Sequence, residues 1–243
     1  KLDSLNTPDL NIASAGHLTI AGGNLGAPTA PIASGLLTQW DAGSLALADG
    51  AQVDSWINSA DPGTRDLTRQ GGSPTYIASE PGLNNLPAVE FAVGGEDWFS
   101  FTQTNQLRSD FFVLKDARVN GNEQFLLGDN NQYHFHNGGW RITNGNAHDD
   151  LENGSVELDG VAVVPNNTDR PSDFAVLSMI TRNGTGLEVS QLSKDRTIAN
   201  RSWEGVMAEI LIYDRTLTAD EEDLVGLYLA EKYALATAYE NWM

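Results

Sequence analysis

Short apolar runs separated by Gly, Asn, Asp and Pro dominate the chain from residue 35 to about residue 217. Each run is only a few residues long, which is typical of a β-strand and too short for a helix. The clearest runs are residues 88–91, 111–114, 125–127, 161–164, 175–177 and 210–213. Their number and spacing predict an all-β fold, an antiparallel two-sheet jelly-roll sandwich with long loops.

One segment near the C-terminus has helical periodicity. Residues Thr218 and Glu221 have the spacing of a capping box, in which each side chain satisfies a backbone amide of the other. Apolar residues then recur at helical spacing, at Leu224, Val225, Tyr228, Leu229 and Tyr233. The pattern predicts a single C-terminal helix that packs on the sandwich through this stripe.

Residues 1–34 have a different pattern, with an eight-residue period. Leucines recur at positions 2, 10 and 18, and isoleucines at positions 12 and 20. Each unit predicts a short strand and a turn, and one such strand pair cannot bury its apolar face alone. Either the segment is a single hairpin on the main domain, or stacked repeats or neighbouring chains cover it. We expect a β-repeat stem with a Pro-rich linker over 1–34 and a jelly-roll domain with its helix over 35–243.

Composition limits the possible partners. The chain has 243 residues, 33 of them acidic and 14 basic, for a formal net charge of −19. This excess argues against nucleic acid and anionic membranes, which both require Lys and Arg. The sequence contains no run of the roughly 18 apolar residues that a spanning helix needs, so we expect no membrane insertion.

Cysteine is absent, which excludes disulfides and thiolate chemistry. The N-terminal residues lack a signal-peptide pattern, and Lys at position 1 suggests a processed chain or a fragment.

Several segments resemble a known domain family. The residues that carry the resemblance are 36–42, 53–58, 87–91 with 95–98, 157–161, and above all 203–218 with 228–233. They are similar to the laminin-G-like, concanavalin A-like jelly-roll domains of bacterial surface proteins and phage fibres. Among them, residues 157–161 resemble the family's hairpin, which implies a turn at Asp159-Gly160. The resemblance extends over most of the chain and implies a fold, but the family is functionally broad, so function has to be argued from a site.

The pattern of acidic residues differs from that of the glycan-cleaving members of this fold. The glucanases carry a Glu-x-Asp-x-x-Glu strand, and no such segment occurs here. Glu204 and Glu209 are five residues apart, which places them on opposite faces of a regular strand. We assign Glu209 a structural role, paired with Arg215 or Lys232, and expect no enzymatic activity and no catalytic residue.

A histidine-rich segment is the main candidate binding site. If residues 133–136 form a strand, His134 and His136 share one face, while Tyr133 and Phe135 share the other. Trp140, Arg141 and His148 follow closely, and such side chains suit a sugar-binding surface. Two alternatives are open: an ordinary solvated strand, and a zinc site completed by His148 or Asp149.

Calcium is a possible cofactor, because this fold often holds an ion in its loops. Asp129, Asn131, Asp149 and Asp150 supply the hard oxygen ligands that calcium takes, without the spacing of an EF-hand.

These observations leave three hypotheses open. The first is a non-enzymatic recognition module, the glycan-binding head of a phage fibre or similar extracellular assembly, which forms a homotrimer through residues 1–34. The second is a structural decoration protein of a virion or filament without a glycan ligand. The third is a polysaccharide-degrading enzyme or its carbohydrate-binding appendage. We expect the protein at a virion surface or outside the cell.

Overall fold

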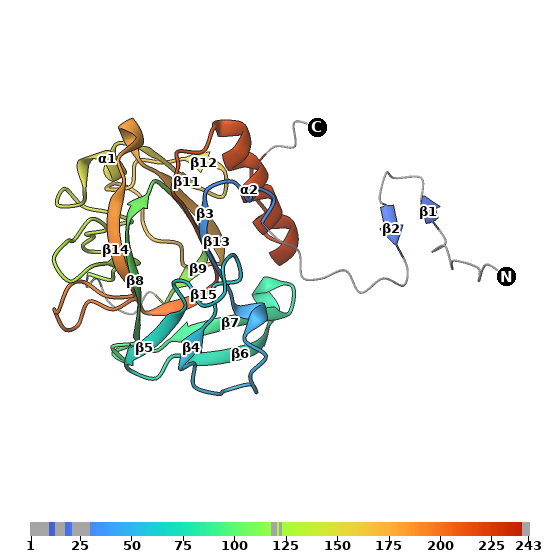
Figure 1. The fold of residues 1–243 in the computed structure, drawn as a ribbon, viewed down its shortest axis with the longest axis horizontal. Helices are drawn as coiled ribbons and strands as arrows, with labels where there is room; N and C mark the ends of the chain where they lie inside the picture. The colour runs from blue at the N-terminus through green and yellow to red at the C-terminus, as the bar shows by residue number, and fades with distance from the viewer. Residues whose placement is uncertain (1–9, 13–17, 21–29, 118–120, 122, 240–243) are drawn as a thin grey trace.

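The structure, a computed structural model, is a sandwich of two antiparallel sheets with a helix on one outer side (Figure 1). It describes residues 10–12, 18–20, 30–117, 121 and 123–239. The all-β two-sheet sandwich with a C-terminal helix is therefore confirmed.

The larger sheet has eight strands in the order β12-β11-β13-β9-β15-β7-β6, with β3 also paired to β15. Its strands are β3 (Leu36–Asp41), β6 (Thr75–Glu80), β7 (Leu86–Phe91), β9 (Ser109–Asp116), β11 (Ser155–Leu158), β12 (Val161–Ala162), β13 (Ala175–Ile180) and β15 (Gly205–Tyr213). The smaller sheet has five strands in the order β10-β14-β8-β5-β4. They are β4 (Ser55–Trp56), β5 (Leu67–Gly71), β8 (Trp98–Leu107), β10 (Leu127–Gly128) and β14 (Leu187–Leu192).

Helices are few. The C-terminal helix is α2 (Ala219–Tyr233), and a single turn, α1 (Asp149–Glu152), precedes β11. The described part of the chain also has three 3-10 turns: η1 (Ala42–Ser44), η2 (Pro81–Leu83) and η3 (Arg182–Gly184).

Two apolar layers hold these elements together. The inner layer lies between the sheets and includes Phe112 and Leu114 of β9. The outer layer lies between the large sheet and α2, and it includes Phe111 and Val113 of the same strand. Because successive side chains of a strand point to opposite faces, β9 is buried on both sides, and its central residues 111–114 are continuously apolar.

A bulge in β15 turns a carboxylate toward the helix. Met207 pairs with Leu114 and Glu209 pairs with Val113, so Ala208 is the extra residue on β15. A bulge places two successive residues against one partner residue and re-aims the side chains that follow. Glu209 thereby lies on the α2 side of the sheet, fully buried.

Four donors satisfy the Glu209 carboxylate. Nε2 of Gln39 and the hydroxyl of Tyr228 donate to Oε1 at 2.7 and 3.0 Å. Nζ of Lys232 and the hydroxyl of Tyr233 donate to Oε2 at 2.7 and 3.0 Å. Lys232 is thus the partner of Glu209, and it links α2 to the large sheet.

Lys232 has a second carboxylate partner, Oδ2 of Asp41 at 2.7 Å. Burial opposes its charge, but the attraction of Glu209 and Asp41 raises the pKa of Lys232 above its ordinary value. Burial raises the pKa of Glu209 despite the nearby ammonium group. The ion pair is therefore both desolvated and fully hydrogen-bonded.

The predicted capping box is confirmed. The Thr218 side chain accepts from the Glu221 amide, and the Glu221 side chain accepts from the Thr218 amide. Arg215 forms a two-pronged ion pair with Glu221, at 2.7 Å for each contact. These contacts lower the pKa of Glu221 to about 2. Arg215 therefore stabilises the start of α2 and is not the partner of Glu209.

The hairpin expected at Asp159-Gly160 is also present. β11 and β12 pair on either side of it, with φ of 54° at Asp159 and 74° at Gly160. Two positive φ values in a two-residue loop are characteristic of the turn that matches strand twist.

A second buried carboxyl group belongs to Glu222 of α2. Among the described residues, no cation contacts it. Glu222 is 5% exposed and accepts one hydrogen bond, from Oγ of Ser178 at 2.7 Å. Burial raises its pKa to about 7, against the Ser178 hydrogen bond and with help from Glu157 and Asp223.

In the N-terminal segment, β1 (Leu10–Ile12) and β2 (Leu18–Ile20) pair antiparallel, with Leu10 opposite Ile20. The rest of the predicted stem and linker up to residue 29 lies outside the described residues. The trimer and the domain boundary at residue 34 remain predictions.

Replacing Lys232 by Met is expected to lower the free energy of unfolding by roughly 3–5 kcal/mol, because Glu209 would lose its buried counter-charge. Urea unfolding measures this difference. Arg182→Met is the matched control, because Arg182 pairs with Asp149 and Asp150 at the surface. Equal, small losses in the two variants would contradict the structural role of Lys232.

Replacing Glu222 by Gln is expected to stabilise the protein at pH 8 by about 2 kcal/mol and to have little effect at pH 5. The folded state raises this pKa from 4.5 to about 7. The stability that the protonated Glu222 carboxyl contributes is therefore full below pH 4.5 and is lost as the pH rises through about 7. Urea unfolding at both pH values tests this, with Glu231→Gln, an exposed position on the same helix, as control. A gain in stability independent of pH would rule out this explanation.

Candidate functional site

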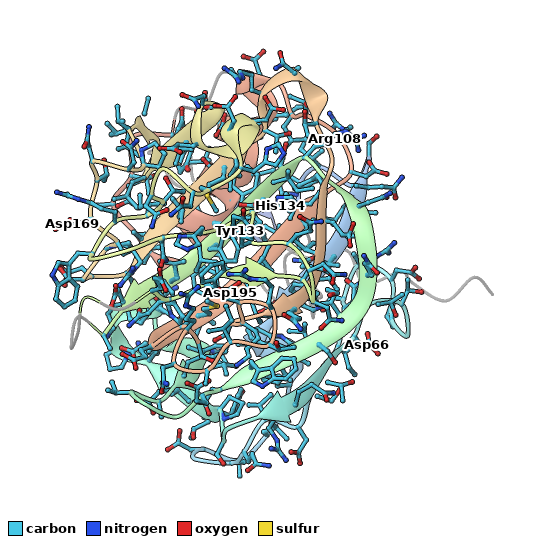
Figure 2. All side chains as sticks on the ribbon, turned by 90° about the vertical axis from the view of Figure 1, so that its left-hand side faces the viewer. Asp66, Arg108, Tyr133, His134, Asp169 and Asp195 are labelled. Atoms are coloured by element: carbon cyan, nitrogen blue, oxygen red, sulfur yellow. The ribbon has the colours of Figure 1, made fainter. Side chains whose placement is uncertain are left out.

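The candidate site lies in the loop between β10 and α1. Tyr133 and His134 lie near the centre of the face seen in Figure 2, with Asp195 close by. Asp195 belongs to the segment between β14 and β15. The site is thus built from two loops that follow β10 and β14, and these two strands pair with each other.

The prediction that residues 133–136 form a strand is wrong. The amide of His136 donates to the carbonyl of Tyr133 at 3.0 Å, which closes a turn. The turn ends the period-two alternation, so His134 and His136 do not share a face. His134 lies against His148, with ring centroids 5.0 Å apart, whereas His136 packs edge-on against Phe125 in the interior.

His134 and His148 line one hollow of about 240 Å³. Its walls are Gln132, Tyr133, His134, Asn146, Ala147 and His148, and we call it the tyrosine hollow. Nδ1 of His148 accepts from the amide of Asp150 at 3.1 Å, which fixes this ring at the start of α1. Burial and the neighbouring His148 lower the pKa of His134 to about 4, against the opposite influence of Asp129. The His134 imidazole is therefore neutral near pH 7.

Tyr133 is the exposed aromatic residue of this hollow, with 43% of its surface accessible. The guanidinium of Arg196 lies 4.7 Å from the centre of its ring. Such a cation–π contact fixes the plane of this exposed ring.

A buried carboxylate, Asp195, holds two arginines. Arg196 donates to it at 2.7 and 3.0 Å, and Arg201 donates to it at 2.6 Å. Burial alone would raise the pKa of Asp195, but the hydrogen bonds from both arginines lower it. Asp195, Arg196 and Arg201 were not predicted as site residues from the sequence. The feature that could have indicated them is the run of charged residues 194–196, which follows strand 187–192.

A second hollow, of about 540 Å³, lies beside Arg201. It is lined by Gly121, Glu123, Gly138, Gly139, Ile198, Ala199, Asn200 and Arg201, and we call it the arginine hollow. Glu123 pairs with Nε of Arg201 at 2.5 Å and lies 3.4 Å from Nε2 of His136. His136 thus supports this hollow from behind and is not on the surface of the tyrosine hollow.

Trp140 and Arg141 are not in the tyrosine hollow either. Trp140 does not line the arginine hollow, but its indole lies near Gly121, 3.7 Å from a side chain built on that glycine. Arg141 pairs with Asp169 at 2.7 Å and donates to the carbonyl of Asn167. Of the five candidate ligand-binding residues, only His134 and His148 line the predicted surface together.

The calcium candidates are not brought together. Asp129 accepts from the amide of Asn131 and from Oγ of Ser190 at 2.9 and 2.6 Å. Asp149 and Asp150 pair instead with Arg182. Among the described residues, no group of three or more His, Asp or Glu side chains is placed to hold a metal ion. The donor set therefore fits neither the calcium site nor the zinc site, which needed the histidines on one face.

Another carboxyl, Glu188 of β14, was also missed. Burial, the charge of Asp129 and a hydrogen bond with it raise the pKa of Glu188. The side chain of Gln103 donates to the same carboxyl group. The carboxyl groups of Asp129 and Glu188 thus lie within hydrogen-bonding contact of each other.

Comparison with known proteins gives limited information. No family profile and no curated protein matches the chain. Among solved structures, the Trypanosoma rangeli sialidase in complex with sialic acid matches with a TM-score of 0.34 and 13% identity. The match covers 93% of this chain and 36% of the sialidase chain. At that level of similarity it says nothing about activity. Among the described residues, no helix is long and apolar enough to cross a membrane.

The His134 imidazole is expected to titrate near pH 4 in a proton NMR experiment, because burial and His148 both disfavour its charged form. Replacing His148 by Gln removes one of these causes, so the pKa of His134 is expected to rise toward 6.5. A midpoint near 6.5 in the unmodified protein would show that the two rings do not form the contact described.

Proposed function

We propose that this protein is a non-enzymatic carbohydrate-recognition module. The observation that carries the proposal is the tyrosine hollow, where the exposed ring of Tyr133 lies beside amide and neutral imidazole groups. An aromatic face binds the apolar C–H face of a sugar ring, and nearby polar groups bind its hydroxyls.

The polar groups of the hollow suit hydroxyls in particular. Gln132 and Asn146 each supply a donor and an acceptor, and so does the neutral imidazole of His134. A sugar hydroxyl also both donates and accepts, so these groups can satisfy it without a net charge. This lining favours a neutral ring over a charged ligand.

The carboxylates support binding without cleavage. A glycosidase needs two carboxyl groups about 5–9 Å apart across the scissile bond. Glu209 is buried against Lys232, and Glu204 accepts from the Gly94 amide and the Gln124 side chain. Asp129 and Glu188 are hydrogen-bonded to each other, which leaves no room for a sugar between them.

The wider assignment is part of the same proposal. The sandwich is compatible with the laminin-G-like, concanavalin A-like family that the sequence resembles, and we propose that the protein is such a domain. A phage fibre or comparable extracellular assembly would use it as a head, with residues 1–34 as the trimeric stem. Antiparallel pairing of β1 with β2 supports strand formation in that stem.

Tyr133→Ala is expected to weaken glycan binding at least tenfold, about 1.4 kcal/mol, because the stacking ring is lost. A glycan array identifies the sugars retained by the unmodified protein, and calorimetry measures the affinity. Tyr133→Phe is the matched control and is expected to keep most of the affinity, since it keeps the ring.

Full binding by Tyr133→Ala would exclude the tyrosine hollow as the site. A blank array, with the protein folded, would contradict the proposed function.

A further inference from the structure

The tyrosine hollow and the arginine hollow share one buried support. From Tyr133, the contact runs to the guanidinium of Arg196 at 4.7 Å and then to Asp195 at 2.7 Å. Asp195 also holds Arg201 at 2.6 Å, and Arg201 holds Glu123 at 2.5 Å. A wall residue of each hollow is thus fixed by the same fully buried carboxylate.

A second set of contacts, through His136, also connects Glu123 to Tyr133. His136 lies 3.4 Å from Glu123, and its imidazole is 6.0 Å from the Tyr133 ring centre, edge to face. Nδ1 of His136 is 2.9 Å from Oδ1 of Asn144, which fixes its orientation. The relative position of the two hollows is therefore held by a contact network that includes the buried side chains of Asp195 and His136.

The arginine hollow has the lining of a sugar site. Three glycines (121, 138 and 139) expose peptide groups on its walls, and Asn200 and Glu123 add side-chain acceptors. The indole of Trp140 lies next to Gly121, one of the residues that line this hollow. The hollow therefore offers the hydroxyl-binding groups that a sugar needs, with an aromatic side chain next to one of its walls.

The charges of the shared support are balanced. Asp195 and Glu123 are the anions, and Arg196 and Arg201 are the cations, in a chain whose formal net charge is −19. A locally neutral surface does not select for an ionic ligand, whereas the acidic remainder repels polyanions.

We infer that the two hollows together bind one uncharged oligosaccharide, with one sugar unit on Tyr133 and a further unit in the arginine hollow. The inference rests on the proposed function and extends it to a ligand class: a neutral glycan chain of several units. Binding energy is then distributed over two sites on one support. The second sugar unit adds contacts without a second loss of the ligand's translational and rotational freedom.

Calorimetry with ladders of neutral gluco-, manno- and galacto-oligosaccharides of one to six units tests this inference on the full chain. At least one ladder is expected to gain tenfold or more in affinity with length. Ala199→Arg places a bulky side chain in the arginine hollow at an exposed position. This variant is expected to lose the gain with length and to keep the affinity for the shortest ligand that binds.

Ala162→Arg is the matched control, at an exposed position in β12, and it is expected to behave like the unmodified protein. Glu123→Gln, which weakens the ion pair to Arg201, is expected to reduce the gain with length without blocking the hollow. Binding that does not increase with length, or a gain that survives Ala199→Arg, would overturn the inference and leave the proposed function intact. No binding to any ladder or array glycan would instead overturn the proposed function.

Discussion

The buried ion pair between Glu209 and Lys232 is the contact on which the arrangement of α2 and the large sheet depends. Desolvating two charges costs more than their attraction returns unless further hydrogen bonds satisfy them. Here Gln39, Tyr228 and Tyr233 supply those bonds, and they come from β3 and from α2 itself. Any shift of the helix along the sheet would break several of these contacts together. The pair thus defines a single position for α2, while the apolar stripe supplies most of the attraction.

Local signals in the sequence were sufficient for much of this fold. The Thr218–Glu221 box depends on neighbouring residues only, and so does the turn at Asp159, which is why both could be predicted. The partner of Glu209 could not be chosen between Arg215 and Lys232. That choice depends on the bulge at Ala208, which turns Glu209 toward the helix and is invisible in a pattern of apolar residues.

The candidate site was predicted only in part, because its geometry depends on contacts between distant segments. Alternation at residues 133–136 indicates a strand only if a partner strand is available, and here a turn forms in its place. His134 and His148 were named as candidates for one surface, and their rings lie 5.0 Å apart in the structure. Asp195 and Glu123 were missed, since nothing near them in the sequence shows that Arg201 joins them.

The distribution of charge gives the acidic composition a specific meaning. Most of the lysines and arginines in the described part of the chain are held in ion pairs with carboxylates, as Lys232 and Arg201 are. Carboxylates therefore outnumber the cations available to them, and those at the surface, such as Asp49, Asp54 and Asp61, give it an acidic charge. Such a surface repels other acidic surfaces, including other copies of this domain. The shared support of the two hollows is an exception, because Arg196 and Arg201 balance the charges of Asp195 and Glu123 there.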